Sequence, residues 1–181
     1  MRLPRMEQYL SLLFTAMAAC LLGLMCYQDW QARSISWPAF PALSLTLLAV
    51  RLQHQPAVQL GYEVLLNWAV VVGLVATLWL YVRLRFGSVR LHDYLGSGDV
   101  LYWIIAAVYF SPVGFLAYFL GSSIVALLVA GILQWYHRSA VADIRIPLAG
   151  VQAACLLALI GLQEVAPTST AYWVNNMLPT I

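Results

Sequence analysis

GSGDVLYWIIAAVYFSPVGFLAYFLGSSIVALLVAGILQWY, residues 96–136, contains one charged side chain, Asp99, and is otherwise almost continuously apolar. A helix that crosses a membrane needs about 20 apolar residues, so the stretch 99–136 is nearly twice too long for a single span. Ser111-Pro112-Val113-Gly114 interrupts it with residues that favour a turn. This stretch therefore predicts two helices, 99–113 and 114–136, joined tightly.

The rest of the chain has the same apolar character. Of its 181 residues 63% are hydrophobic and 9% are charged, whereas a soluble domain has about half apolar and a quarter charged residues. This composition predicts an all-α, polytopic transmembrane helical bundle with about six spans. The expected spans are 8–27, 37–53, 61–83, 99–113, 114–136 and 147–164. No internal repeat or linker divides the sequence, so residues 1–181 are expected to form one integral membrane domain.

Arginines supply all the positive charge, because the chain has no lysine, and the net charge is only +2. They are scattered over the loops, which argues against a nucleic-acid surface. With six spans, the loops after the first, third and fifth spans lie on one side of the membrane. That side holds six arginines against three on the other, so the positive-inside rule makes it cytoplasmic. The six are Arg33, Arg83, Arg85, Arg90, Arg138 and Arg145, and the three are Arg2, Arg5 and Arg51.

Two aspartates lie at the margins of apolar segments on this predicted cytoplasmic side. Asp29 follows the first span and Asp99 begins the fourth. An ionisable group at such a place is costly and usually functional. Two adjacent carboxyls can hydrolyse a peptide bond when one is ionised and accepts a proton from water while the other is protonated and polarises the carbonyl. Two like charges about 4 Å apart repel by roughly 4 kcal/mol at an effective dielectric constant near 20, which keeps one proton on the pair; the sequence leaves open which carboxyl holds it.

Glycines flank Ser97 directly before the second aspartate. Without a Cβ, Gly96 and Gly98 let the backbone adopt strained dihedrals and approach an extended substrate closely. Structural alternatives exist for both acids. Asp99 is also a favourable N-cap for the fourth helix, and Asp29 is spaced to pair with Arg33 at a helix end.

Three segments together resemble the type IV prepilin peptidases, a family of GxGD intramembrane aspartyl proteases. Asp29-Trp30-Gln31-Ala32-Arg33-Ser34-Ile35 resembles the first motif of the family, and Gly96-Ser97-Gly98-Asp99-Val100 matches the glycine-x-glycine-aspartate motif. Ile146-Pro147-Leu148 with Gly150 is similar to the isoleucine-proline stretch that begins the last helix. Order, spacing and the six-span layout extend the resemblance over nearly the whole chain.

The resemblance implies a specific activity and site. Asp29 and Asp99 would be the catalytic pair, with Gly96, Gly98, Arg33 and Pro147 supporting the motifs or the substrate. The enzyme would be a multi-pass endopeptidase of the bacterial inner membrane that removes the leader peptide of prepilins or pseudopilins at the cytoplasmic face. Its expected partners are that substrate, the bilayer, and proteins of a type IV pilus or type II secretion assembly. No cofactor or metal is expected, and the first span begins too early for the methyltransferase domain of longer members.

The sequence also departs from the family pattern. Leu101 stands where the family usually has a lysine, and the first motif has a displaced proline and no asparagine. Alternative interpretations are a preflagellin-type or other GxGD protease, or a catalytically inert membrane component of a pilus or secretion system. A transporter that relays protons through the aspartates is disfavoured, because polar residues gather at one end of the spans and not in their middles.

Overall fold

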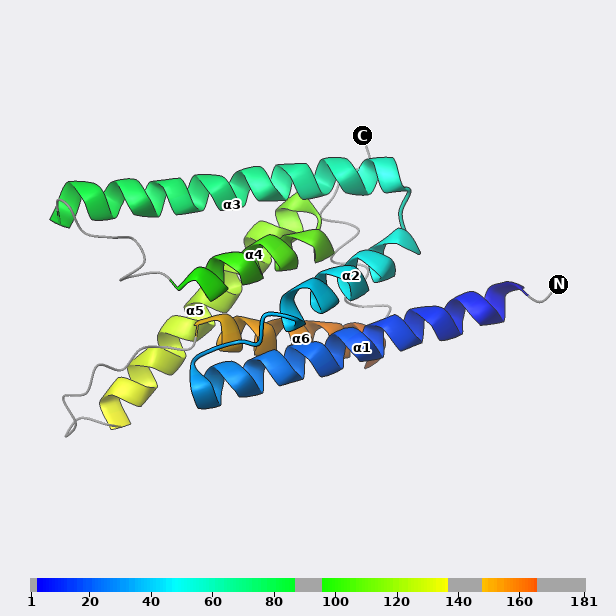
Figure 1. Cartoon of the computed structure of the whole chain (residues 1–181), viewed down its shortest axis with the longest axis horizontal. Helices are drawn as coiled ribbons and strands as arrows, with labels where there is room; N and C mark the ends of the chain where they lie inside the picture. Colours follow the sequence, from blue (N-terminus) through cyan, green and yellow to red (C-terminus); the bar gives the residue numbers. More distant parts are fainter. Residues whose placement is uncertain (1–2, 87–95, 137–147, 166–181) are drawn as a thin grey trace.

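A computed structural model describes residues 3–86, 96–136 and 148–165. In these residues all regular structure is helical, which confirms the predicted all-α class. The helices are α1 (Leu3–Ala32), α2 (Ala39–Leu52), α3 (Ala57–Phe86), α4 (Ser97–Tyr109), α5 (Pro112–Tyr136) and α6 (Leu148–Val165). They alternate in direction, so the carboxyl ends of α1, α3 and α5 lie at the same end of the bundle as the amino ends of α2, α4 and α6 (Figure 1). We call this the aspartate end, since α1 finishes and α4 starts there.

The apolar helices fit a membrane. Three helices are long and apolar enough to cross it, over Gln8–Ala32, Ala57–Arg85 and Pro112–Trp135. Each is followed along the chain by a shorter apolar helix. The outer faces of the long helices expose large apolar side chains such as Leu84, Val72 and Leu127. A soluble monomer rarely exposes apolar area on this scale. The chain is therefore a helical membrane protein, and about six spans is consistent with its helices.

The helix boundaries differ from the predicted ones in two places that matter for the site. The helix α1 continues to Ala32, so Asp29 lies within the helix and not beyond its end. The helix α4 ends at Tyr109 and α5 begins at Pro112, earlier than the predicted break. Proline has no N–H to donate and its ring fixes φ near a helical value, which suits the first position of a helix.

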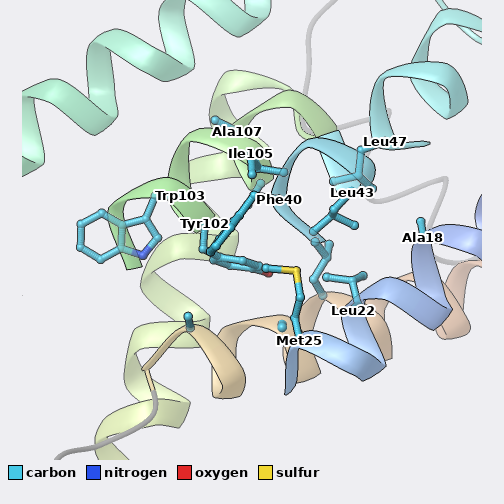
Figure 2. Packing of buried hydrophobic residues seen from close by; sticks show 14 of the residues in the cluster. Ala18, Leu22, Met25, Phe40, Leu43, Leu47, Tyr102, Trp103, Ile105 and Ala107 are labelled. Carbon is cyan, nitrogen blue, oxygen red and sulfur yellow. The ribbon is translucent and has the colours of Figure 1, made fainter. Parts of the chain in front are cut away.

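The core lies where α1, α2, α4 and α6 meet. Leu22 and Met25 from α1, Leu43 from α2 and Tyr102 from α4 are fully buried, and in Figure 2 the Met25 side chain extends toward Tyr102. The helix α1 packs most extensively against α6 and next against α2. Both α1 and α6 bury alanines, such as Ala18 and Ala153. Small residues let helix backbones approach closely, which is the main way that membrane helices gain packing energy.

The helix α3 completes the hydrogen bonding of α4 at the end opposite the aspartates. The Asn67 amide donates to the carbonyl oxygens of Ala107 and Phe110, both at 2.8 Å, and the Trp68 indole N–H donates to the carbonyl of Ile104 at 3.1 Å. The last carbonyls of a helix have no partner within that helix. Side chains of α3 thus satisfy the carboxyl end of α4 and fix its position along α3.

Candidate active site

Asp29 occupies the last turn of α1 and faces the inside of the bundle. Its side chain is buried, and Oδ2 accepts a hydrogen bond of 2.6 Å from the backbone N–H of Gly150 in α6. The helix ends three residues later, at Ala32; the next residue, Arg33, donates its N–H to the Asp29 carbonyl and adopts a left-handed backbone with φ 51°. A left-handed residue just past the last turn is a common helix terminator.

Asp99 is the third residue of α4. The N-cap is Gly96, so the alternative in which Asp99 itself caps the helix is wrong. Asp99 Oδ1 accepts a hydrogen bond of 3.0 Å from the backbone N–H of Ala149, and its carboxylate also accepts one from the N–H of Gly96. An acidic residue at this third position commonly reaches back to the N-cap amide in this way.

The two carboxylates therefore bind consecutive N–H groups, those of Ala149 and Gly150, at the start of α6 (the beginning of the orange helix in Figure 1). The first N–H groups of a helix lack internal partners and carry the positive end of its dipole, so they favour bound carboxylates. Asp29 and Asp99 lie close enough to interact electrostatically. Among the residues that the structure describes, neither forms an ion pair with a cation. The structure thus brings together two acids that are far apart in sequence and holds them with backbone donors.

Two glycines make this close approach possible. A Cβ on Gly150 would lie 2.9 Å from Asp29 Oδ2 and 3.1 Å from the Asp29 Cβ, and a Cβ on Gly96 would lie 2.9 Å from Asp99 Oδ2. The sequence predicted that Gly96 and Gly98 are needed for strained dihedrals, and this is not what the structure has. Gly96 is extended with ordinary angles (φ −64°, ψ 138°), and a Cβ on Gly98 would only touch Phe40 at 3.9 Å. Gly96 is required for space and not for backbone strain.

The remaining predicted site residues lie elsewhere. The side chain of Arg33 is exposed and makes no ion pair with Asp29, so the structural alternative of an Asp29–Arg33 pair is wrong. Arg33 serves instead to end α1. Pro147, together with His92 and Asp93 before the glycine motif, lies outside the described residues.

A buried polar network lies one turn below the carboxylates. The Trp103 indole N–H donates to Gln152 Oε1 at 2.7 Å, and the Tyr118 hydroxyl donates to the Gln152 carbonyl at 2.7 Å. Tyr102 and Tyr118 share a further hydrogen bond between their hydroxyls, at 2.7 Å. These four residues are buried and connect α4, α5 and α6. Sequence reasoning missed this network, although one signal for it was present: Gln152 is an amide inside an apolar stretch, with only apolar residues and glycine from 148 to 151 and from 153 to 162.

The aspartates lie deeper than the end of the bundle. The helix α4, with 13 residues, is about 20 Å long, which is shorter than a hydrocarbon core of about 30 Å. The helix α3 runs beside α4, and its last turn, which holds Arg83 and Arg85, continues past the start of α4 (Figure 1). Three exposed tryptophans, Trp30, Trp37 and Trp135, surround the same end, and tryptophan is enriched at membrane–water interfaces. The start of α4, which carries Asp99, therefore lies further inside the bundle than the end of α3.

Comparisons with models of protein families, with curated proteins and with solved structures give no match to this chain. The family resemblance consequently depends on the three segments quoted above.

Proposed function

We propose that this protein is a membrane-embedded aspartyl endopeptidase that removes the leader peptide of type IV prepilins or pseudopilins at the cytoplasmic face of a bacterial inner membrane. One observation carries the proposal: Asp29 and Asp99, from α1 and α4, accept hydrogen bonds from adjacent amides of α6 without an ion-pair partner among the described residues. Two carboxyls without a fixed cation can share one proton, as acid–base hydrolysis requires.

In the proposed reaction the ionised carboxylate accepts a proton from a water molecule, and the oxygen of that water attacks the scissile carbonyl carbon. The protonated carboxyl donates to the carbonyl oxygen as the tetrahedral intermediate forms. Collapse of the intermediate breaks the C–N bond: the leaving amine takes a proton from one carboxyl, and a hydroxyl of the intermediate returns its proton to the other, so that the pair again holds one proton. The hydrogen bonds from the amides of Ala149 and Gly150 hold the two carboxyls in position during these steps.

The depth of the site supports a substrate that is itself a membrane helix preceded by a polar leader. Exposed tryptophans lie at the aspartate end, and the last turn of α3, which holds Arg83 and Arg85, continues past the start of α4. A peptide bond at the junction between a polar leader and an apolar helix would reach the same depth. A backbone in helical form is protected by its own hydrogen bonds, so the bond must be presented in extended form before it can be attacked.

A purely structural function is the second candidate, and the hydrogen bonds themselves favour it. Carboxylates that bind the first amides of α6 stabilise that helix end whether or not they perform chemistry. The two candidate functions predict different effects when asparagine replaces the aspartates. Its side-chain oxygen caps a helix about as well as aspartate does, but it neither accepts nor donates a proton at neutral pH.

The test is co-expression of the protein with a pilin-like substrate from the same organism, read out as the mobility shift of the cleaved substrate. Wild type should cleave it, whereas Asp29→Asn and Asp99→Asn should each lower the rate by roughly a thousandfold or more while leaving the protein folded and inserted. Glu63→Gln is the matched control, because it also replaces a carboxylate by an amide, but at the end opposite the aspartates. Cleavage retained in either aspartate variant would rule out the pair.

A further inference from the structure

We infer that Gln152 is a positioning residue, which anchors the start of α6 to α4 and α5 and thereby aims the Ala149 and Gly150 amides at the two carboxylates. The inference rests on the proposed function for its kinetic consequence. Its structural part, the link between Gln152 and the aspartates, stands on geometry alone.

Gln152 uses both its side chain and its backbone in this link. Its side-chain oxygen accepts from Trp103 in α4, and its carbonyl oxygen accepts from Tyr118 in α5. It is 1% exposed and lies less than one turn after Gly150. A displacement of Gln152 must therefore move the Gly150 amide with it.

One partner of Gln152, Trp103, lies one turn from the acid on its own helix. Trp103 follows Asp99 by one helical turn, so these two residues face the same side of α4. Both contacts between α4 and α6, Trp103–Gln152 and Asp99–Ala149, are thus on neighbouring turns of the same pair of helices. Two bonded contacts fix the rotation of one helix against another, which a single contact does not.

The Tyr102–Tyr118 pair extends the same link across the bundle. Tyr102 is fully buried, and its hydroxyl contacts the hydroxyl that donates to the Gln152 carbonyl. The side-chain nitrogen of Gln152 has no hydrogen-bond partner among the described residues, so the link depends on the bonds that the two oxygens of Gln152 accept. Breaking either bond would leave a further buried polar group unpaired, which is costly. Apolar contacts are not directional, so without these hydrogen bonds α6 could shift slightly against its neighbours.

Trp103→Phe is the variant that tests the inference, because it keeps an aromatic ring and removes only the N–H donor to Gln152. Trp68→Phe is its matched control, since it removes an indole N–H that also donates between helices, but from α3 to the Ile104 carbonyl of α4 and without any bond to α6. Tyr118→Phe, which removes the donor to the Gln152 carbonyl, is a second variant in case the first folds poorly.

The first measurement is independent of catalysis. Protein labelled with ¹⁵N-glycine is titrated with acid, and the Gly150 amide resonance is identified as the one whose pH-dependent shift is lost in Asp29→Asn. In Trp103→Phe we expect the midpoint of this titration to move to higher pH, because a donor that withdraws favours the ionised carboxylate less. Trp68→Phe should keep the wild-type midpoint. Equal midpoints in wild type and Trp103→Phe would overturn the inference even if the protein proves not to be a peptidase.

The second measurement uses the cleavage assay. Loss of one buried hydrogen bond corresponds to a rate change of roughly five- to tenfold. We expect Trp103→Phe to lower kcat by about that factor, to leave KM unchanged, and to move the acidic limb of the pH–rate profile to higher pH. A loss of thermal stability with unchanged kcat and pH profile would show a merely structural role and would overturn the inference. Failure of the wild type to cleave any substrate counts against the proposed function and not against the titration result.

Discussion

The carboxylates at the two ends of the bundle have different partners: backbone amides at one end and an arginine at the other. At the aspartate end, Asp29 and Asp99 bind consecutive backbone amides of α6. At the opposite end, Glu63 at the start of α3 forms an ion pair with Arg51 at the end of α2, and Gln59 donates a further hydrogen bond to Glu63 at 3.4 Å. The side chains of Arg51 and Glu63 are both largely buried.

The difference concerns protonation: the Glu63 carboxylate is held in its charged form, whereas Asp29 and Asp99 have, within the part of the chain that the structure describes, no cation that would prevent one of them from binding a proton. A guanidinium fixes the charge of its partner acid, because protonation of Glu63 would leave a buried cation unpaired. Amide donors at the start of α6 stabilise charge without adding a full positive charge, so the aspartate pair can still hold one proton between two acids. Fixed charge joins α2 to α3 at one end, whereas the function proposed for the other end requires one proton shared by the two acids.

The largest effect should come from crowding the aspartate end. Gly150→Ala places a methyl group about where Asp29 already lies, since the nearest Asp29 atom is 2.9 Å from the added Cβ. We expect cleavage to fall by roughly ten- to a hundredfold, because misplacement of a catalytic group by about 1 Å costs that much. Gly161→Ala on the same helix meets nothing within 4 Å and is the control. If both variants cleave at the wild-type rate, the close packing of Asp29 on α6 is not needed for catalysis.

A change at the opposite end should affect stability and leave the chemistry intact. Asn67→Leu removes the amide that satisfies the carbonyls of Ala107 and Phe110. Leaving a buried acceptor without a partner costs about 1–3 kcal/mol, so the thermal midpoint in detergent should drop clearly. The pH–rate profile of the folded fraction should stay as in wild type. Thr77→Val is a mild comparison on the same helix, because it removes a bond to the Gly73 carbonyl that α3 makes with itself.

The Arg51–Glu63 pair should show a smaller loss of stability. Glu63→Gln leaves Arg51 without its anionic partner, and we expect a destabilisation of about 1–2 kcal/mol, between the values for exposed and fully buried pairs. Adding Arg51→Gln should recover part of this loss, because the unpaired cation is then gone. Equal stability losses in the double variant and in the sum of the two single variants would show that the pair is not coupled as described. Chemical denaturation of all three variants in detergent measures this.

The smallest effect is expected at the second glycine of the motif. A Cβ on Gly98 reaches only Phe40, at an ordinary contact distance of 3.9 Å, and the backbone there is regular helix. Gly98→Ala should therefore fold normally and keep its cleavage rate within a few fold. Gly96→Ala, which crowds the Asp99 carboxylate, should be clearly slower. Equal rates for the two variants would contradict this ranking; a steady-state cleavage assay compares them directly.

The order of the helices could be predicted from the sequence to a large extent. Apolar length and the Ser111-Pro112 interruption predict six helices, because a bilayer limits span length and proline begins a helix readily. The same reasoning misplaced the end of α1, since Arg33 ends that helix in a left-handed conformation that arginine rarely adopts. The sequence contains no local signal for such a residue.

The sequence by itself determined the class of the protein, an apolar helical bundle with two acids at the margins of its spans, because hydropathy and periodicity are local properties of the chain. Only the tertiary structure decided that Asp29 and Asp99 bind neighbouring amides of α6, and that Trp103, Tyr118 and Gln152 join three helices beneath them. Such contacts depend on the rotation and depth of each helix against its neighbours. Those quantities are set by side-chain packing and by unpaired backbone donors across the whole bundle, and no short stretch of sequence contains them.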